Sequence, residues 1–181
     1  MLQTEPQVHR LTVDDVQSMV AAGILDESSR VELLDGVLYD VSPPGPAHAG
    51  AVSWLIRHFA RGLDDHEVRV QDVLLVAGGF VSPDLIVVER LPRDRLPDTA
   101  ELAIEVAVTT HRHDTAKAAR YAREHVREYW LVDLPGRRVR VHRRPTPEGF
   151  DEQFVAHDGE RLQPLVGGPA VDVTELLGPV A

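Results

Sequence analysis

Cysteine is absent from the 181-residue chain, and lysine occurs once, at Lys117. Without cysteine the chain can form neither a disulfide framework nor a zinc site built on thiolates. No apolar run reaches the roughly 18 residues that a membrane-spanning helix needs. The first ten residues also lack the basic and apolar regions of a signal peptide. From these absences we expect a cytoplasmic protein without a membrane partner.

Positive charge is scarce as well, with 19 basic against 29 acidic side chains and a net charge of −10. This balance excludes a protein that coats nucleic acid through a uniformly basic surface. The 43% hydrophobic and 27% charged fractions are those of an ordinary soluble globule. The length suits a single domain over residues 1–181. The acidic excess is compatible with a cation site, because carboxylates gathered at such a site would themselves add negative charge.

Hydrophobic periodicity predicts the N-terminal elements. Residues 11–23 suit a short helix, with Thr12 as its N-cap and Gly23 as its terminator. Asp35-Gly36 stands between two alternating apolar runs and therefore predicts a hairpin. A second helix is expected over residues 48–65, whose apolar side chains recur at helical spacing.

Shorter apolar runs follow and predict strands over 68–78, 84–89, 101–108 and 128–134. A helix is expected over 114–125, then a C-terminal hairpin over 137–144 and 150–159, and a short helical turn at the end. This order predicts an α/β or α+β fold with one mixed central sheet flanked by helices.

The most informative strand is "ELAIEVAV", residues 101–108. Its alternation places Leu102, Ile104, Val106 and Val108 on one face and Ala103, Glu105 and Ala107 on the other. A carboxylate between two alanines indicates either an edge strand with Glu105 in solvent or a small-walled recess. A buried carboxylate must be paired or must hold a cation.

Asp84 offers a second carboxylate, directly after Pro83 and before an apolar strand. A turn residue would also be placed there. Two carboxylates with waters are the usual way to hold Mg²⁺ or Mn²⁺. The helix that follows the Glu105 strand carries Lys117, and its return across the sheet can bring the amine within reach of Glu105.

These residues, with their flanks "VELLDGVLYDVSPPGPAH" and "RHDTAKAARYAREHVREYWLVD", resemble the PD-(D/E)XK nuclease superfamily. The chain is most similar there to the bacterial Uma-type family of restriction endonucleases, over roughly Val31 to Arg143. The resemblance implies a restriction-endonuclease-like fold with a nuclease core at about residues 48–134.

The resemblance also implies roles for particular residues. Asp84, Glu105 and the backbone carbonyl of Val106 would be ligands of Mg²⁺ or Mn²⁺, with Glu32 as a further candidate ligand. The superfamily usually has lysine two residues after the glutamate, where this chain has Ala107. Lys117 would be its counterpart on the next helix and would orient the attacking water. If Lys117 does not replace it, Ala107 indicates an inactive enzyme.

Several other side chains have both a functional and a structural interpretation. His48 matches a histidine of the family and also suits the entry of a helix. Tyr121 stands one turn after Lys117, where core packing is the alternative to a site role. Asp114 can cap its helix and pair with Lys117, which would explain the lysine structurally.

Arginines gather near the C-terminal hairpin, where Arg138, Arg140 and Arg144 share a strand face. They would follow a phosphate backbone, or they would form a solvated face. Our leading hypothesis is a metal-dependent endonuclease that cuts DNA, as a homodimer on duplex DNA. A catalytically inactive descendant that binds nucleic acid or protein stays open, as does a hydrolase of another phosphoester.

Overall fold

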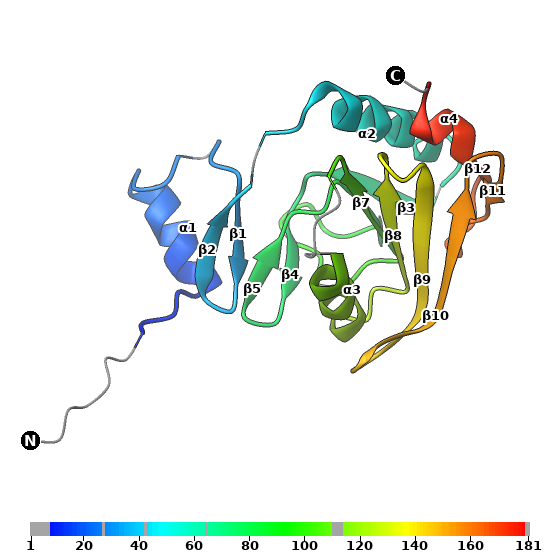
Figure 1. Ribbon diagram of the computed structural model, residues 1–181. Coiled ribbons are helices and arrows are strands. Elements are labelled where there is room, and N and C mark those ends of the chain that lie inside the picture. Colours follow the sequence, from blue (N-terminus) through cyan, green and yellow to red (C-terminus); the bar gives the residue numbers. More distant parts are fainter. Residues whose placement is uncertain (1–7, 27, 42, 64, 110–113, 180–181) are drawn as a thin grey trace, which may run out of the picture.

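The computed structural model describes residues 8–26, 28–41, 43–63, 65–109 and 114–179. Within these ranges it contains helices and strands in two main sheets and one short ribbon (Figure 1). The elements are α1 (Val13–Ala21), β1 (Val31–Leu34), β2 (Val37–Asp40), α2 (Pro46–Phe59), β3 (His66–Val70), β4 (Leu74–Val76), β5 (Gly79–Val81), β6 (Leu85–Glu89), β7 (Leu102–Ala107), α3 (Asp114–Arg123), β8 (Glu128–Asp133), β9 (Arg138–Thr146), β10 (Gly149–His157), β11 (Arg161–Leu162), β12 (Val171–Asp172) and α4 (Val173–Leu177).

The N-terminal elements confirm the predicted helix and hairpin. Thr12 caps α1 by accepting a hydrogen bond from the Asp15 backbone, and the Asp15 side chain accepts one from the Thr12 backbone. The β1–β2 hairpin turns at Asp35 and Gly36, which both have positive φ. This backbone twist matches the strands, which is why the Asp-Gly pair favours such a turn.

The central sheet has six described strands in the order β10-β9-β8-β7-β6-β3. It is mixed, because β7 and β8 run parallel while their neighbours run antiparallel. Parallel neighbours need a crossover, and α3 supplies it. The mixed sheet with helices therefore confirms the predicted class, an α/β or α+β fold with one mixed central sheet flanked by helices.

Each face of this sheet has its own apolar core. Leu102, Ile104 and Val106 pack with α2 and α4, whereas Ala103 and Ala107 pack on the side of α3. The predicted alternation in β7 is therefore correct. The sheet also continues through β9 and β10, beyond the nuclease core expected at about 48–134.

The single strand predicted over residues 68–78 was wrong. Gln71 has a φ of 48°, which ends β3 and sends β4 into a separate four-stranded sheet, β2-β1-β5-β4. Strand β5 of that sheet was not predicted. A Cβ atom at Gly79 would lie 1.9 Å from the carbonyl oxygen of Leu33, so β5 can pair with β1 only because residue 79 is glycine. This pairing fixes the strand that carries Glu32.

Candidate active site

Two buried carboxylates lie on neighbouring strands of the central sheet. Asp84 directly precedes β6 and Glu105 lies in β7, where Leu85 pairs with Ile104. Their residues are only 7% and 8% exposed. Glu105 therefore does not lie in solvent on an edge strand, and it is buried as the alternative of a recess requires. Carboxylates buried to this degree require partners.

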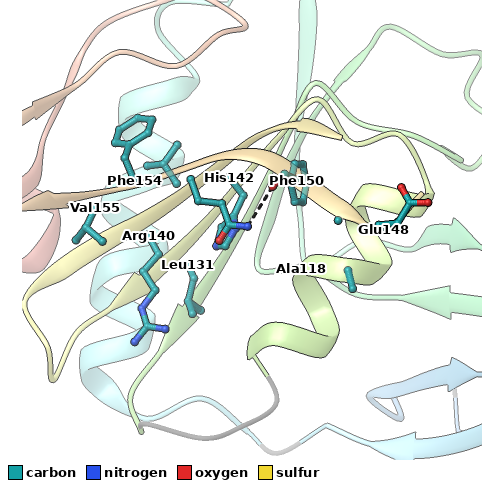
Figure 2. Close-up of a pocket in the computed structure, with 12 residues that line it drawn as sticks. Ala118, Leu131, Arg140, His142, Glu148, Phe150, Phe154 and Val155 are labelled. Atoms are coloured by element: carbon teal, nitrogen blue, oxygen red, sulfur yellow. Dashed lines mark hydrogen bonds between the residues drawn. The ribbon is translucent and has the colours of Figure 1, made fainter. Parts of the chain in front are cut away.

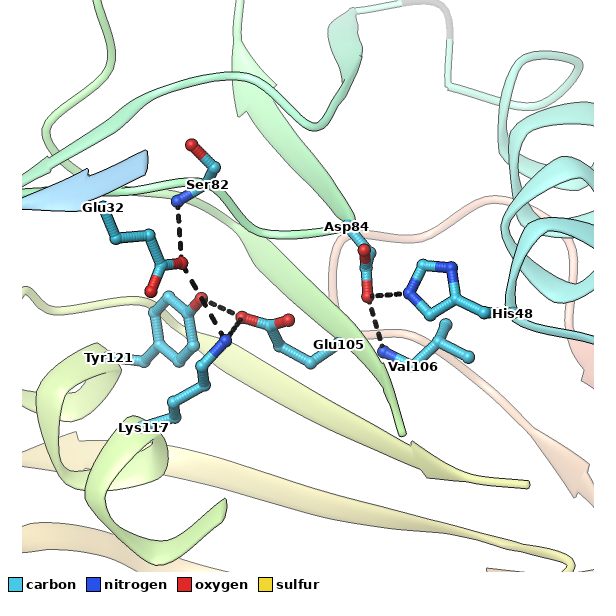
Figure 3. Close-up of polar contacts among 8 residues, drawn as sticks. All are labelled: Glu32, His48, Ser82, Asp84, Glu105, Val106, Lys117 and Tyr121. Carbon is cyan, nitrogen blue, oxygen red and sulfur yellow. Dashed lines mark hydrogen bonds and ion pairs between the residues drawn. The ribbon is translucent and has the colours of Figure 1, made fainter. Parts of the chain in front are cut away.

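Glu105 receives two hydrogen bonds on one oxygen. The Nζ atom of Lys117 lies 2.9 Å from Oε1 of Glu105, and the hydroxyl of Tyr121 donates to the same oxygen at 2.7 Å (Figure 3). Lys117 and Tyr121 are four residues apart on α3, so they share one face of the helix. That face lies over β7, which explains why a helix can supply the amine.

Asp84 is held in the same manner from the other side. Its Oδ2 accepts a hydrogen bond from the backbone N–H of Val106 at 2.8 Å and lies 2.9 Å from Nε2 of His48. His48 comes from the first turn of α2 and is buried, and its Nδ1 has no hydrogen-bond partner within the described chain. The contact of Val106 is through its N–H, and the metal-binding role of its carbonyl stays a prediction.

A third carboxylate reaches the site from the smaller sheet. Oε1 of Glu32 lies 3.9 Å from Nζ of Lys117 and accepts a hydrogen bond from the backbone N–H of Ser82 at 3.2 Å. Figure 3 shows Glu32, Lys117 and Glu105 directed toward one another. Ser82 was not predicted at the site, because a backbone donor leaves no signal in the residue types.

The charges of this cluster follow from burial and proximity. Burial raises the pKa of Glu105, against the opposing effect of the Lys117 ammonium. Burial lowers the pKa of Lys117, but the charges of Glu105 and Glu32 outweigh it and raise that pKa above its ordinary value. Burial and Glu105 also raise the pKa of Tyr121 well above its usual range. Lys117 is therefore a cation and Tyr121 a hydrogen-bond donor near neutral pH.

The two carboxylates each keep one open oxygen. Both donors of Glu105 use Oε1 and both partners of Asp84 use Oδ2, which leaves Oε2 and Oδ1 without hydrogen bonds among the described residues. Hard oxygen donors suit Mg²⁺ or Mn²⁺, which commonly keep several waters. Three His, Cys, Asp or Glu side chains arranged as a metal site are not found in the described part of the chain. The donor set thus fits an ion held by two carboxylates and water.

The predicted DNA-binding arginines lie apart from this cluster and face carboxylates. Asp133 accepts a hydrogen bond from Nε of Arg138 at 2.9 Å, and Nη2 of Arg140 lies 3.8 Å from it. Arg144 pairs with Glu152 at 3.1 Å. Whether these arginines bind DNA stays a prediction. The predicted pair of Asp114 with Lys117 stays a prediction, because the structure describes the backbone of Asp114 and not its side chain.

Comparisons with known proteins support the restriction-endonuclease-like fold. No curated protein matches the chain. A crystal structure of "a putative nuclease belonging to DUF820 from Anabaena variabilis ATCC 29413" is similar in fold, with a TM-score of 0.74 at 16% identity over 92% of this chain and 97% of that one. No described helix is long and apolar enough to cross a membrane. The model of the Uma2 family, described as "Putative restriction endonuclease", matches residues 14–174. The chain therefore belongs to the Uma2 family, and this membership supports a nuclease function.

Proposed function

We propose that this protein is a metal-dependent endonuclease that hydrolyses phosphodiester bonds in DNA. The observation that carries the proposal is the pairing at Glu105, where Lys117 and Tyr121 occupy Oε1 and leave Oε2 open. A site in which the Lys117 ammonium is held beside an open carboxylate oxygen suits a reaction that builds negative charge on a phosphate.

Asp84 and Glu105 would hold the ion through their open oxygens, with Glu32 as a further candidate beside Lys117. Bound Mg²⁺ or Mn²⁺ would lower the pKa of a water and polarise the phosphate. The charges of Glu105 and Glu32 raise the pKa of Lys117 and favour its ammonium form. This ammonium would orient the attacking water and offset charge on the phosphate. Tyr121 and His48 orient the two carboxylates.

The nucleic acid would reach the site along the face of the sheet that carries Glu105. Arg138 and Arg140 lie two strands away from β7 and offer positive charge to the backbone. Arg144 is the most exposed of the three predicted contacts, at 71%. One site cuts one strand, so cleavage of both strands of a duplex would require a homodimer.

One observation favours the second candidate in its protein-binding form, a descendant of the nuclease fold without catalysis. The protein carries a net charge of −10, and Arg138 and Arg144 are already paired with carboxylates. Such a surface binds DNA weakly, because affinity depends on unpaired cations that displace counterions.

The test is cleavage of supercoiled plasmid in Mg²⁺ or Mn²⁺, with EDTA as the metal-free condition. Glu105→Gln removes the charge that holds the ion, and Glu152→Gln makes the same change on the exposed hairpin. We expect cleavage by the wild type and by Glu152→Gln, and its loss with Glu105→Gln or EDTA. Equal nicking by all three proteins would show that this cluster is not the catalytic site.

A further inference from the structure

A recess of about 320 Å³ lies between α3 and strands β8 to β10 (Figure 2). Ala118 and Ala119, the two residues after Lys117, form its helical wall, and their small side chains leave the space. Figure 2 shows Arg140 at one end of the recess and Glu148 at the other. Residues of the cluster around Glu105 do not line this recess. Of the predicted DNA contacts, Arg140 lines it.

The strand register connects the recess to the candidate active site. Glu105 pairs with Leu131, and Leu131 pairs with Arg140, so the three side chains stand in one row on one face of the sheet. Neighbouring strands are about 4.8 Å apart, which places the Cα of Arg140 about 10 Å from that of Glu105. A strand whose phosphate lies at Glu105 can therefore place the adjoining nucleotide at Arg140.

The polar groups of the recess have hydrogen-bonding capacity to spare. Arg140 is 3.8 Å from Asp133, which Arg138 contacts more closely, and the Arg140 side chain is 40% exposed. Gln153 uses its amide nitrogen on the carbonyl of Phe150 and leaves its amide oxygen without a hydrogen bond within the described chain.

His142 adds a ring to the floor of the recess. Its ring lies between those of Tyr129 and Phe150 and is tilted against both, and its Nδ1 is buried without a hydrogen-bond partner in the described ranges. Burial and the charge of Arg140 lower the pKa of His142, so the ring is neutral near pH 7. A neutral imidazole can donate from one nitrogen and accept at the other.

We propose that this recess binds one unpaired nucleotide of the substrate strand, with its phosphate at Arg140 and its base beside Gln153 and His142. The inference rests on the proposed nuclease function and specifies its substrate. The volume matches the lower end of small-molecule sites, and an amide and an imidazole suit the polar edge of a base. A base stacked in a duplex cannot enter such a recess unless it is flipped out. The preferred DNA is therefore unpaired next to the cut bond.

Binding tests this inference apart from cleavage. The probe is a 12-nucleotide single strand containing one 2-aminopurine, titrated in Mg²⁺ with protein in a Lys117→Ala background that keeps both carboxylates. Added to this background, Ala119→Leu fills the recess without removing a polar group, and Gln153→Ala removes one. Gln163→Ala is the matched control for Gln153→Ala, because Gln163 also donates its side-chain amide to a backbone carbonyl but does not line the recess. Thermal unfolding checks that each variant is folded.

We expect Ala119→Leu and Gln153→Ala each to weaken binding of the probe about tenfold, the scale of one lost base contact. Gln163→Ala should leave the affinity within about twofold, and the matching fully paired duplex should bind more weakly than the single strand. Equal affinity for all variants, or tighter binding of the duplex, overturns the recess proposal even if the wild type cleaves DNA. Recess-dependent binding by a wild type that cleaves nothing would support the recess and contradict the nuclease proposal.

Discussion

Lys117 donates from Nζ to Oε1 of Glu105 across 2.9 Å, although the two residues are 12 positions apart and lie on different elements. The strand position two residues after the glutamate is occupied by Ala107, which packs on the same side as α3. The amine is therefore supplied from the helix above the sheet and not from the strand. The proposed chemistry requires an ammonium group beside Glu105, and a lysine on α3 meets this requirement as well as one on the strand would.

Tyr121 supplies the second hydrogen bond to the same oxygen, and Tyr121→Phe removes only that bond. Groups that orient a metal-binding carboxylate contribute about 10- to 100-fold to metal affinity or activity. We expect about a tenfold loss in the cleavage rate and weaker Mn²⁺ binding by titration calorimetry, in a variant that thermal unfolding shows to be folded. A normal rate with normal Mn²⁺ affinity would assign Tyr121 to core packing alone.

Glu128 is a buried carboxylate outside the candidate site, and it can be compared with Glu105. It is fully buried in β8 and accepts hydrogen bonds from Trp130, Arg143 and the backbone N–H of Leu165. Glu128→Ala leaves the Arg143 guanidinium without this partner, which costs about 3–5 kcal/mol when a buried pair is broken. Urea unfolding should show this loss, while the cleavage rate per folded molecule stays near that of the wild type. A change in rate without a change in stability would contradict a structural role.

His142 should make stability depend on pH. Its folded pKa is lowered from 6.5 by burial and by Arg140, so the unfolded chain binds the proton more tightly. Its contribution is complete above pH 6.5 and is lost as the pH falls below 6.5 toward the lowered value. The free energy of unfolding of the wild type, relative to His142→Gln, should therefore decrease between pH 8 and pH 5. A difference that stays constant over this range would show that His142 titrates normally.

The sequence was sufficient for elements whose signals are local. The Asp35-Gly36 turn, the cap at Thr12 and the alternation in β7 each depend on neighbouring residues, and each was predicted correctly. The break at Gln71 was not, because a non-glycine residue at positive φ has no reliable sequence signal. Strand β5 was missed because its pairing with Leu33 is a tertiary contact.

The candidate site shows the same division between local and long-range information. The residue types of Asp84, Glu105 and Lys117 pointed to cation chemistry, and the structure places them on adjoining elements. The choice of oxygen that each partner contacts could not be read from the sequence, because it depends on how α2 and α3 lie on the sheet. The row from Glu105 to Arg140 likewise follows from the strand register alone.

The most direct test of the central claim is the single-turnover cleavage rate of wild type and Lys117→Ala in saturating Mg²⁺. Removing one positioned charge at a phosphate typically lowers such rates about 100- to 1,000-fold. We predict a loss of this size, with Mn²⁺ binding retained because Asp84 and Glu105 remain in place. Equal rates for the two proteins would contradict the account.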